Sequence, residues 1–274
     1  MTIPKAGVIG WPIKHSKSPL LHGYWLRRHG IEGEYTKVAA APDEFEETVQ
    51  RLVDDGWRGA NVTIPHKEAA LALADEVSET ARAIGAANTL IFRDGRIHAD
   101  NTDGYGFTEN LKDRAGIAWK ENASAMIFGA GGASRAIIHA LLKAGAPEIR
   151  LTNRTKSRAD TLALDFGSRV KVVDWAERSE ALSGAALLVN TTSLGMAGQP
   201  PLEIDLSKAS PDAVATDIVY TPLETPFLES AAAAGLVSVD GLGMLIHQGR
   251  PGFEAWFGAP VKADEEVRKV LLAA

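Results

Sequence analysis

The order of hydrophobic and polar positions along the chain predicts short strands that alternate with amphipathic helices. In the N-terminal part, apolar runs predict strands at Ala6–Gly10, Glu34–Ala39, Ala60–Ile64, Leu90–Phe92 and Ile97–Ala99. Asp94-Gly95 lies between the last two strands and favours a tight hairpin turn. Apolar residues spaced three and four apart predict one helix with Ser18-Pro19 as N-cap and first helical residue, and another over Asp43–Asp54.

The alternation becomes more regular from about Ser124 onward. Strand Ala125–Phe128, a glycine-rich turn and a helix over Ser134–Ala144 begin a βαβ unit. Further strands are predicted at Ile149–Thr152, Val170–Val173, Leu187–Val189, Val214–Val219 and Val237–Val239. This order is typical of a doubly wound, dinucleotide-binding sheet.

We therefore predict an α/β fold with two α/β domains. Residues 1–104 form the first, a substrate-binding domain, and residues 105–240 form the second, a Rossmann-like doubly wound domain. Residues 241–274 read as three helical pieces without a strand, which could hardly extend the second sheet. We expect these C-terminal helices to return to the first domain and complete it.

Composition excludes several classes of protein. Of the 274 residues, 45% are hydrophobic and 23% charged, which is typical of a folded soluble protein. A net charge of −6 argues against nucleic acid or an anionic membrane as partner. The chain has no cysteine, no apolar stretch near the roughly 20 residues of a membrane helix, and no secretory signal pattern. We expect a cytoplasmic protein without disulfides, thiolate chemistry or a metal site.

A glycine-rich loop provides the cofactor signal. Gly129-Ala130-Gly131-Gly132-Ala133 follows an apolar strand and opens a helix, with Ser134 in the place of the usual third glycine. Glycines there allow a tight turn and the close approach of backbone N–H groups to a pyrophosphate, which a helix N-terminus also attracts.

The end of the next strand predicts which dinucleotide is bound. An NAD site would usually place a carboxylate there for the adenosine ribose. This chain instead has Asn153-Arg154-Thr155-Lys156-Ser157-Arg158, in which three cations surround two hydroxyls. Such a cluster suits a 2′-phosphate, with Arg154 able to make a bidentate contact. The sequence thus favours NADP over NAD.

Polar segments of the first domain suggest a substrate site. Ser16 and Ser18 precede a helix and could together hold a small carboxylate, although Ser18 taken alone is better explained as an N-cap. Pro65 reads as the first helical residue after a strand, which places Lys67 in a first turn, where the helix dipole disfavours a cation. Asp103 could cap a helix that begins near Tyr105, or it could partner Lys67 in proton transfer.

Nine segments together resemble the shikimate/quinate dehydrogenase family over nearly the whole length of the chain. The segments of the first domain are His15-Ser16-Lys17-Ser18-Pro19, Asn61 to Lys67, Gly85-Ala86-Ala87-Asn88-Thr89 and Asn101-Thr102-Asp103-Gly104. The others are the glycine loop, Asn153-Arg154-Thr155, Asn190 to Met196, and the pair Asp217-Ile218-Val219-Tyr220 and Gly241 to Gln248.

This resemblance implies reversible, NADPH-dependent reduction of 3-dehydroshikimate to shikimate, a step of chorismate and aromatic amino-acid biosynthesis. It implies Lys67 and Asp103 as the catalytic pair. Substrate contacts are implied for Ser16, Ser18, Thr63, Asn88, Asp103, Tyr220 and Gln248. Cofactor contacts are implied for the glycine loop, for Asn153, Arg154, Thr155 and Arg158, and for Thr191, Ile218, Gly241 and Met244.

Two departures from the family pattern and several alternatives stay open. Gly23 follows His22, and Gln248 to Phe253 lacks the usual run of small residues, which puts the local helix geometry in question. A quinate-using or dual-specificity enzyme, an amino-shikimate reductase and a non-catalytic sensor of the pathway are the competing functions. A metal hydrolase lacks ligand spacing, and a short-chain dehydrogenase lacks a Tyr followed by Lys four residues later. The sequence leaves open whether the chain forms a homodimer.

Overall fold

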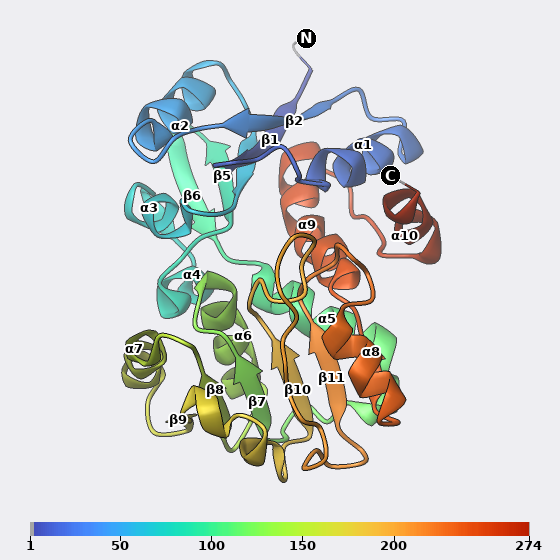
Figure 1. Cartoon of the computed structure of the whole chain (residues 1–274). Coiled ribbons are helices and arrows are strands. Elements are labelled where there is room, and N and C mark those ends of the chain that lie inside the picture. Colours follow the sequence, from blue (N-terminus) through green and yellow to red (C-terminus); the bar gives the residue numbers. More distant parts are fainter. Residues whose placement is uncertain (1–2, 274) are drawn as a thin grey trace. The chain divides into compact units, whose positions relative to one another are not determined.

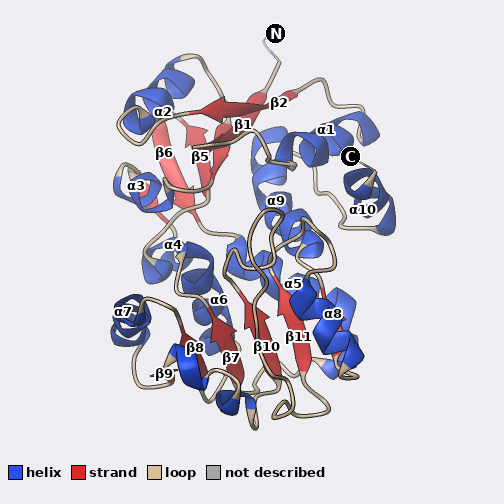
Figure 2. Ribbon diagram, in the orientation of Figure 1, coloured by secondary structure: helices blue, strands red, loops and turns tan. Residues whose placement is uncertain are grey.

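The computed structural model describes residues 3–273 and consists of two compact units (Figures 1 and 2). The first unit contains the chain up to Gly106 and again from Leu245 onward, and the second contains Phe107–Met244. Both divisions fall inside helices, namely α5 (Asp103–Ala115) and α9 (Leu242–Phe257). Within residues 3–273, no helix is both long and apolar enough to cross a membrane.

The first unit is built on a six-stranded mixed sheet with the order β2-β1-β3-β5-β6-β4. Its strands are β1 (Lys5–Gly10), β2 (Glu34–Ala39), β3 (Gly59–Val62), β4 (Glu76–Val77), β5 (Thr89–Arg93) and β6 (Arg96–Asp100). β1 is parallel to β2 and β3, whereas β5 is antiparallel to β3 and β6. Asp94 and Gly95 have φ values of 53° and 72°, so the predicted hairpin turn is confirmed.

Some helices of this unit begin at other residues than the sequence predicts, α1 (Ser18–Arg28) one residue earlier and α3 (Lys67–Ala72) later. The unit also contains α2 (Phe45–Asp54), α4 (Glu79–Ile84) and α10 (Glu265–Leu272). Lys17 is the N-cap of α1 and Ser18 its first residue, so Ser18 as N-cap was wrong. Pro65 as first helical residue was also wrong, because His66 N donates to Thr63 O and closes a turn before α3 begins. Lys67 nevertheless lies in the first turn of α3, as predicted.

The two faces of this sheet are packed differently. One face buries aliphatic residues of β1, β3, β5 and β6 against α2, around Phe45 and Val49. The other face carries a group of aromatic rings, in which His22 of α1 stacks on Tyr35 of β2 with ring centroids 3.9 Å apart. Phe253 and Trp256 of α9 lie beside His22, so the returning C-terminal helix completes this face.

The second unit has a fully parallel sheet with the order β12-β11-β10-β7-β8-β9, seen in the lower part of Figure 1. Its strands are β7 (Ala125–Phe128), β8 (Ile149–Thr152), β9 (Val170–Val172), β10 (Leu187–Asn190), β11 (Val214–Asp217) and β12 (Val237–Val239). Counted from β7, the spatial order is 3-2-1-4-5-6, the arrangement of a dinucleotide-binding fold. The predicted fold class is confirmed.

Helices cover both faces of this parallel sheet. They are α6 (Gly132–Lys143), α7 (Lys156–Phe166) and α8 (Pro226–Ala233), with short 3₁₀ turns at Gly116–Ala118, Trp175–Glu177 and Glu180–Leu182. Ala125 and Ile127 of β7 are buried in a core with α5, α6 and α7, whereas the alternate residues Met126 and Phe128 join a core with α8. Because β7 is buried on both faces, it reads as a continuous apolar run in the sequence.

Candidate active site

The serine loop follows β1 and leads into α1. The backbone N–H of Ser18 lies 3.3 Å from Ser16 Oγ, so the two predicted carboxylate-binding hydroxyls lie on one turn. Ser16 is partly exposed and Ser18 buried. Lys17 Nζ, between them in sequence, donates to the main-chain oxygen of Leu271 at 2.8 Å. The C-terminal helix α10 therefore helps to fix this loop.

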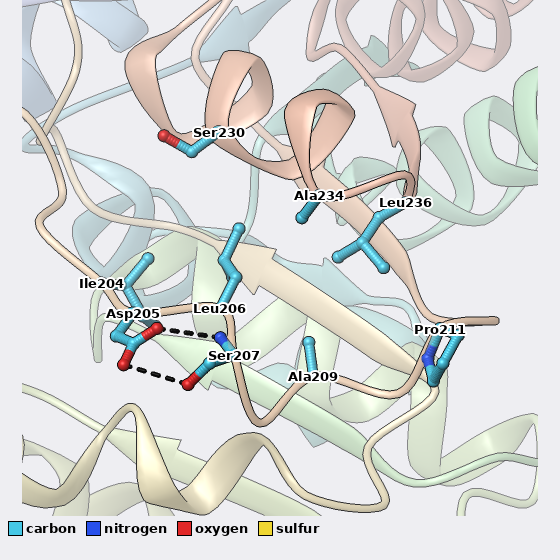
Figure 3. A pocket seen from close by; sticks show the side chains of 9 residues that line it. All are labelled: Ile204, Asp205, Leu206, Ser207, Ala209, Pro211, Ser230, Ala234 and Leu236. Atoms are coloured by element: carbon cyan, nitrogen blue, oxygen red, sulfur yellow. Dashed lines mark hydrogen bonds between the residues drawn. The ribbon is translucent and has the colours of Figure 1, made fainter.

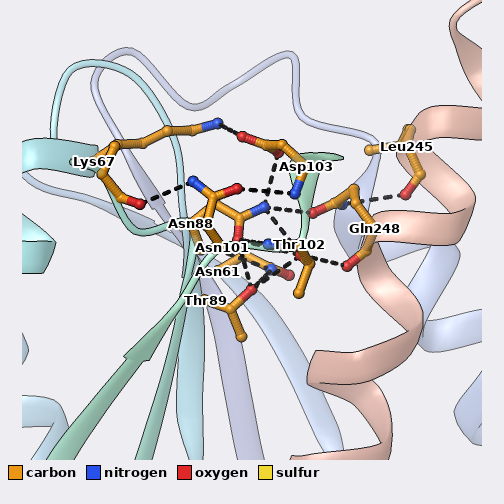
Figure 4. A network of polar contacts seen from close by, with 10 residues as sticks. Asn61, Lys67, Asn88, Thr89, Asn101, Thr102, Asp103, Leu245 and Gln248 are labelled. Atoms are coloured by element: carbon orange, nitrogen blue, oxygen red, sulfur yellow. Dashed lines mark hydrogen bonds and ion pairs between the residues drawn. The ribbon is translucent and has the colours of Figure 1, made fainter. Parts of the chain in front are cut away.

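Lys67 and Asp103 form an ion pair in the first unit (Figure 4). Lys67 is the first residue of α3 and Asp103 the first residue of α5, and their side chains are only 18% and 8% exposed. Asn101 Oδ1 accepts from Asp103 N at 3.1 Å and so satisfies the first N–H of α5. The helix thus begins at Asp103 rather than near Tyr105, and the Asp103 carboxylate is left to pair with Lys67.

Asn88 connects this ion pair to α9. Its Nδ2 donates to Asp103 Oδ1 at 2.8 Å and lies 3.2 Å from Gln248 Oε1, while its Oδ1 accepts from Thr102 N at 2.8 Å. Figure 4 shows these side chains gathered where β5, β6 and α9 meet. The structure therefore brings together four of the predicted site residues: Lys67, Asn88, Asp103 and Gln248.

The unusual segment after Gln248 leaves helix α9 unbroken. α9 continues through Pro251, and Thr102 Oγ1 donates a hydrogen bond to the Gln248 carbonyl oxygen at 2.8 Å. A Cβ at position 249 would lie 3.2 Å from His22 Nε2, and one at position 252 would lie 2.6 Å from the Trp256 ring. The glycines therefore allow α9 to pack closely against these rings. The departure from the family pattern does not distort the position of Gln248 on the helix.

Thr63 and Tyr220 lie outside this hydrogen-bonded group. Thr63 follows β3, donates its N–H to Ile9 O at 2.9 Å and is partly exposed. A Cβ on Gly10 would come within 2.6 Å of the Thr63 methyl group, so β1 lies directly beside it. Tyr220 belongs to the second unit, after β11, where burial raises the pKa of its phenol.

Sequence reasoning missed Tyr35 and assigned no role to Asn61. Tyr35 Oη donates to Asn61 Oδ1 at 2.6 Å, and Asn61 Nδ2 lies 3.3 Å from Asn88 O. The one available signal was an asparagine inside an otherwise apolar strand. The histidine next to Lys67 has a structural role, because His66 is buried and its Nε2 lies 2.9 Å from Ala40 O.

In the second unit, the glycine loop joins β7 to α6. Gly129 has φ 109°, and a Cβ there would lie 2.6 Å from Thr191 Oγ1, so only glycine fits. α6 begins at Gly132, and both Gly131 and Gly132 are exposed. The N–H groups of a first helical turn have no partner within the helix. The loop is therefore suited to hold a pyrophosphate.

The segment after β8 is anchored to this loop and carries exposed cations. Asn153 Oδ1 accepts from Ala130 N at 3.2 Å, and the Thr155 hydroxyl makes no cap hydrogen bond to α7. Among residues 3–273, no carboxylate pairs with the exposed Arg154 or Arg158, but Lys156 pairs with Asp174 at 2.5 Å. Of the three cations in this segment, Arg154 and Arg158 are thus the two without a carboxylate partner within residues 3–273.

The remaining predicted cofactor residues lie at or near the carboxyl ends of β10 and β11. Thr191 Oγ1 donates to Phe128 O at 2.8 Å. A Cβ on Gly241 would lie 2.4 Å from Ile218 O, so these two predicted residues are in contact. Met244 is buried in the core of the second unit. Nearby, Asp217 accepts hydrogen bonds from Asn190, Val219 and Thr225, although burial raises its pKa.

A separate cavity of about 470 Å³ lies on the second unit (Figure 3). Pro211, in the turn that leads into β11, and Leu236, directly before β12, are among its lining residues. Because all strands are parallel, these amino ends lie at the sheet edge opposite the glycine loop. Asp205 in this cavity is already bonded to Ser207 N and Oγ, which lowers its pKa. No cluster of three potential metal ligands occurs within residues 3–273.

A parallel sheet of this order, with a glycine loop after its first strand, is the architecture of a dinucleotide-dependent α/β oxidoreductase. Three family models match the chain: the shikimate dehydrogenase substrate binding domain over residues 8–90, shikimate / quinate 5-dehydrogenase over 113–197, and the shikimate 5′-dehydrogenase C-terminal domain over 241–272. A shikimate dehydrogenase (NADP(+)) of Cereibacter sphaeroides is 55% identical over 274 residues, which cover 100% of this chain and 98% of the relative. The chain belongs to the shikimate dehydrogenase family.

Solved structures agree with this assignment. The shikimate 5-dehydrogenase of Thermus thermophilus in complex with NADP(H) and shikimate is 35% identical, with a TM-score of 0.88 and 99% of each chain covered. A quinate dehydrogenase of Corynebacterium glutamicum in complex with NAD is 29% identical, with a TM-score of 0.91 and again 99% of each chain covered. The fold is thus shared by enzymes whose substrates and cofactors differ.

Proposed function

We propose that the chain is an NADP-dependent shikimate dehydrogenase, which reversibly reduces 3-dehydroshikimate to shikimate in chorismate and aromatic amino-acid biosynthesis. The observation that carries the proposal is the Lys67–Asp103 ion pair, held by Asn88 in a mostly buried position. The NADP(+)-dependent relative at 55% identity supports the choice of substrate and cofactor.

The first unit binds the substrate in this proposal. The hydroxyls of Ser16 and Ser18 donate to its carboxylate, and the two serines are already placed on one turn. Thr63, Asn88, Asp103 and Gln248 bind the ring hydroxyls. The amide of Asn88 and that of Gln248 are oriented by hydrogen bonds to Thr102 N and Leu245 O, so little side-chain entropy is lost on binding.

The second unit binds the cofactor, and its residues fit that role. In the glycine loop Gly129–Ala133, the first turn of α6, which begins at Gly132, offers its N–H groups to the pyrophosphate. Arg154 and Arg158 offer two cations without a carboxylate partner within residues 3–273, and Thr155 offers a hydroxyl, to the 2′-phosphate. Thr191, Ile218, Gly241 and Met244 complete the cofactor site. When bound, NADPH supplies the hydride that reduces the ring carbonyl carbon.

Lys67 and Asp103 handle the proton. During reduction, the oxygen of the ring carbonyl gains negative charge, and the Lys67 ammonium stabilises this oxygen and donates a proton to it. In the reverse direction, Lys67 accepts that proton from the ring hydroxyl. Asp103 orients Lys67 through the ion pair, and Asn88 in turn fixes one carboxylate oxygen of Asp103. Asn88 thus positions Asp103, Asp103 positions Lys67, and the Lys67 ammonium is the group that carries the proton in this proposal.

The deciding experiment measures cofactor reduction by the purified chain with shikimate or quinate, each combined with NADP or NAD. It is repeated with Lys67→Ala and with Lys5→Ala, a matched control that removes only an exposed ion pair with Glu34. Rapid turnover with shikimate and NADP alone, lowered by about 10²- to 10⁴-fold in Lys67→Ala and unchanged in Lys5→Ala, is expected.

Other outcomes point to the competing functions. Comparable turnover of quinate, or comparable use of NAD, would replace the proposed specificity with that of a quinate-using or dual-specificity enzyme. Binding of shikimate without any turnover would indicate a sensor. Normal turnover by Lys67→Ala would remove Lys67 from the chemistry while leaving the substrate assignment in place.

A further inference from the structure

Tyr35 is a buried phenol to which neither the sequence nor the proposed reaction assigns a role. It lies on β2, between β1 and the ring of His22, and is 7% exposed. Its hydroxyl donates to Asn61 Oδ1 at 2.6 Å. Burial raises the pKa of this phenol well above its ordinary value, so Tyr35 stays protonated and acts as the donor.

A buried series of hydrogen bonds leads from Tyr35 toward the ion pair. Asn61 Nδ2 faces Asn88 O and Thr89 Oγ1 at 3.3 and 3.4 Å, and Thr89 Oγ1 donates to Asn88 Oδ1 at 2.9 Å. With its oxygen occupied in this way, Asn88 presents Nδ2 to Asp103 Oδ1 at 2.8 Å. Asp103 must accept this bond, because an amide nitrogen has no lone pair to offer.

The direction of each bond follows from the one before it. Since Tyr35 has a single proton, its donation makes Asn61 Oδ1 the acceptor and turns Asn61 Nδ2 toward Asn88 O. The reverse orientation of Asn61 would set two oxygens against each other. The Ser18 side chain lies beside the Tyr35 hydroxyl and lowers its pKa, so the same phenol borders the serine loop.

We propose that Tyr35 is a positioning residue that holds the Asp103 carboxylate toward Lys67 through Asn61, Thr89 and Asn88. The proposal rests on the proposed function, because its main readout is dehydrogenase turnover. Tyr35 does not itself touch the substrate. Its hydroxyl fixes the amide of Asn61, and the side chains that lead from there to Asp103, namely Asn61, Thr89 and Asn88, are all buried.

The test compares Tyr35→Phe, which removes only the hydroxyl, with Trp256→Phe as a matched control. Trp256 belongs to the same group of aromatic rings and also makes one buried hydrogen bond, to Leu90 O at 3.0 Å, outside the Tyr35 series. Thr89→Val interrupts the series at a second point, and the double variant Tyr35→Phe/Thr89→Val completes a cycle.

We expect Tyr35→Phe to lower kcat about fivefold, the effect of losing one hydrogen bond, with the KM for NADP unchanged. Thr89→Val should lower kcat similarly, and the double variant should be no slower than the slower single variant, because both interrupt the same series. Trp256→Phe should keep kcat within about twofold even where its thermal stability falls as much as that of Tyr35→Phe.

Three results would overturn the proposal. The first is a kcat of Tyr35→Phe equal to that of Trp256→Phe, and the second is that the effects of Tyr35→Phe and Thr89→Val on kcat simply multiply in the double variant. The third is a rise in the KM of Tyr35→Phe for NADP as large as its fall in kcat. If Tyr35→Phe does not fold, a normal kcat for Thr89→Val refutes the proposal by itself. If the wild-type chain turns over no shikimate, the proposed function fails, and the side-chain NH₂ signal of Asn88 in nitrogen-15 NMR decides about Tyr35. That signal shifts in Tyr35→Phe if the series is coupled, and it stays in place if Tyr35 serves packing alone.

Discussion

Cofactor choice should depend on Arg154 far more than on its neighbour Lys156. Arg154 is exposed at the end of β8, directly after Asn153, whose side chain is bonded to the backbone of the glycine loop. Among residues 3–273 no carboxylate pairs with Arg154, so its full charge is available to a phosphate, whereas Lys156 is held by Asp174. The variants Arg154→Ala and Lys156→Ala therefore remove one cation each from the same segment but with different expected results.

The magnitude follows from the bonds that Arg154 can make. A hydrogen bond to a charged group contributes about 1.5–3 kcal/mol, and each 1.4 kcal/mol is a factor of ten in affinity. Arg154→Ala should thus raise the Kd for NADP about 10- to 150-fold. NAD has no 2′-phosphate, so its Kd should change by less than about twofold. Lys156→Ala should weaken NADP binding only about two- to threefold, as expected for a cation already paired.

The assay is a titration of each cofactor, followed by calorimetry or by protein fluorescence, at low and at high ionic strength. Added salt should narrow the difference between the wild-type chain and Arg154→Ala, because exposed charges are screened. An equal loss for Lys156→Ala, or an equal loss of NAD and NADP affinity in Arg154→Ala, would refute this account of the cofactor site.

Three other variants test the remaining parts of the structure. Asp103→Asn should lower kcat about 10²- to 10⁴-fold with little change in the KM for NADP, and a kcat within threefold of wild type in steady-state kinetics would contradict its role. Burial lowers the pKa of His22 from 6.5 to about 3 in the folded chain. As pH falls from about 6.5 toward 3, His22 therefore binds a proton in the unfolded chain but not in the folded one, and the free energy of unfolding decreases. Urea unfolding should show this loss as about 1.4 kcal/mol per pH unit, and His22→Phe should abolish that part of the slope; equal slopes would rule it out. Gly129→Ala should cost about 1–3 kcal/mol of stability and abolish NADP binding, because φ is 109° and the added Cβ would meet Thr191. A Cβ on Gly131 would meet nothing within 4 Å, so the control Gly131→Ala should unfold at nearly the wild-type urea concentration.

The strands of the second unit could be predicted closely from the sequence. Ala125–Phe128, Ile149–Thr152 and Val237–Val239 match the observed strands residue for residue. Strands of a parallel sheet covered on both faces are continuous apolar runs, and polar turns bound them sharply. By contrast, the two-residue strand β4 could not be predicted, because only its pairing with β6 defines it.

The candidate site was predicted in its residues but not in its connections. Lys67 and Asp103 are 36 positions apart, and their pairing depends on where α3 and α5 begin relative to the sheet. Tyr35 and Asn61 meet because β2 and β3 both pair with β1, a register that no local pattern reveals. The partner of Lys156 was missed for the same reason, since Asp174 follows a different strand.

The discontinuity of the first unit bears on the order in which the chain can fold during synthesis. The ribosome adds every residue of the second unit to the chain before it adds α10 and most of α9. Until then, β3 lacks Trp256, whose indole lies against Gly59 and bonds to Leu90, and the serine loop lacks the Leu271 carbonyl that holds Lys17. Although domains generally fold from the N-terminus as they emerge, here the unit that begins first is completed last. A chain that stops before Leu245 would therefore hold a finished nucleotide-binding unit attached to an N-terminal unit with one face of its sheet uncovered.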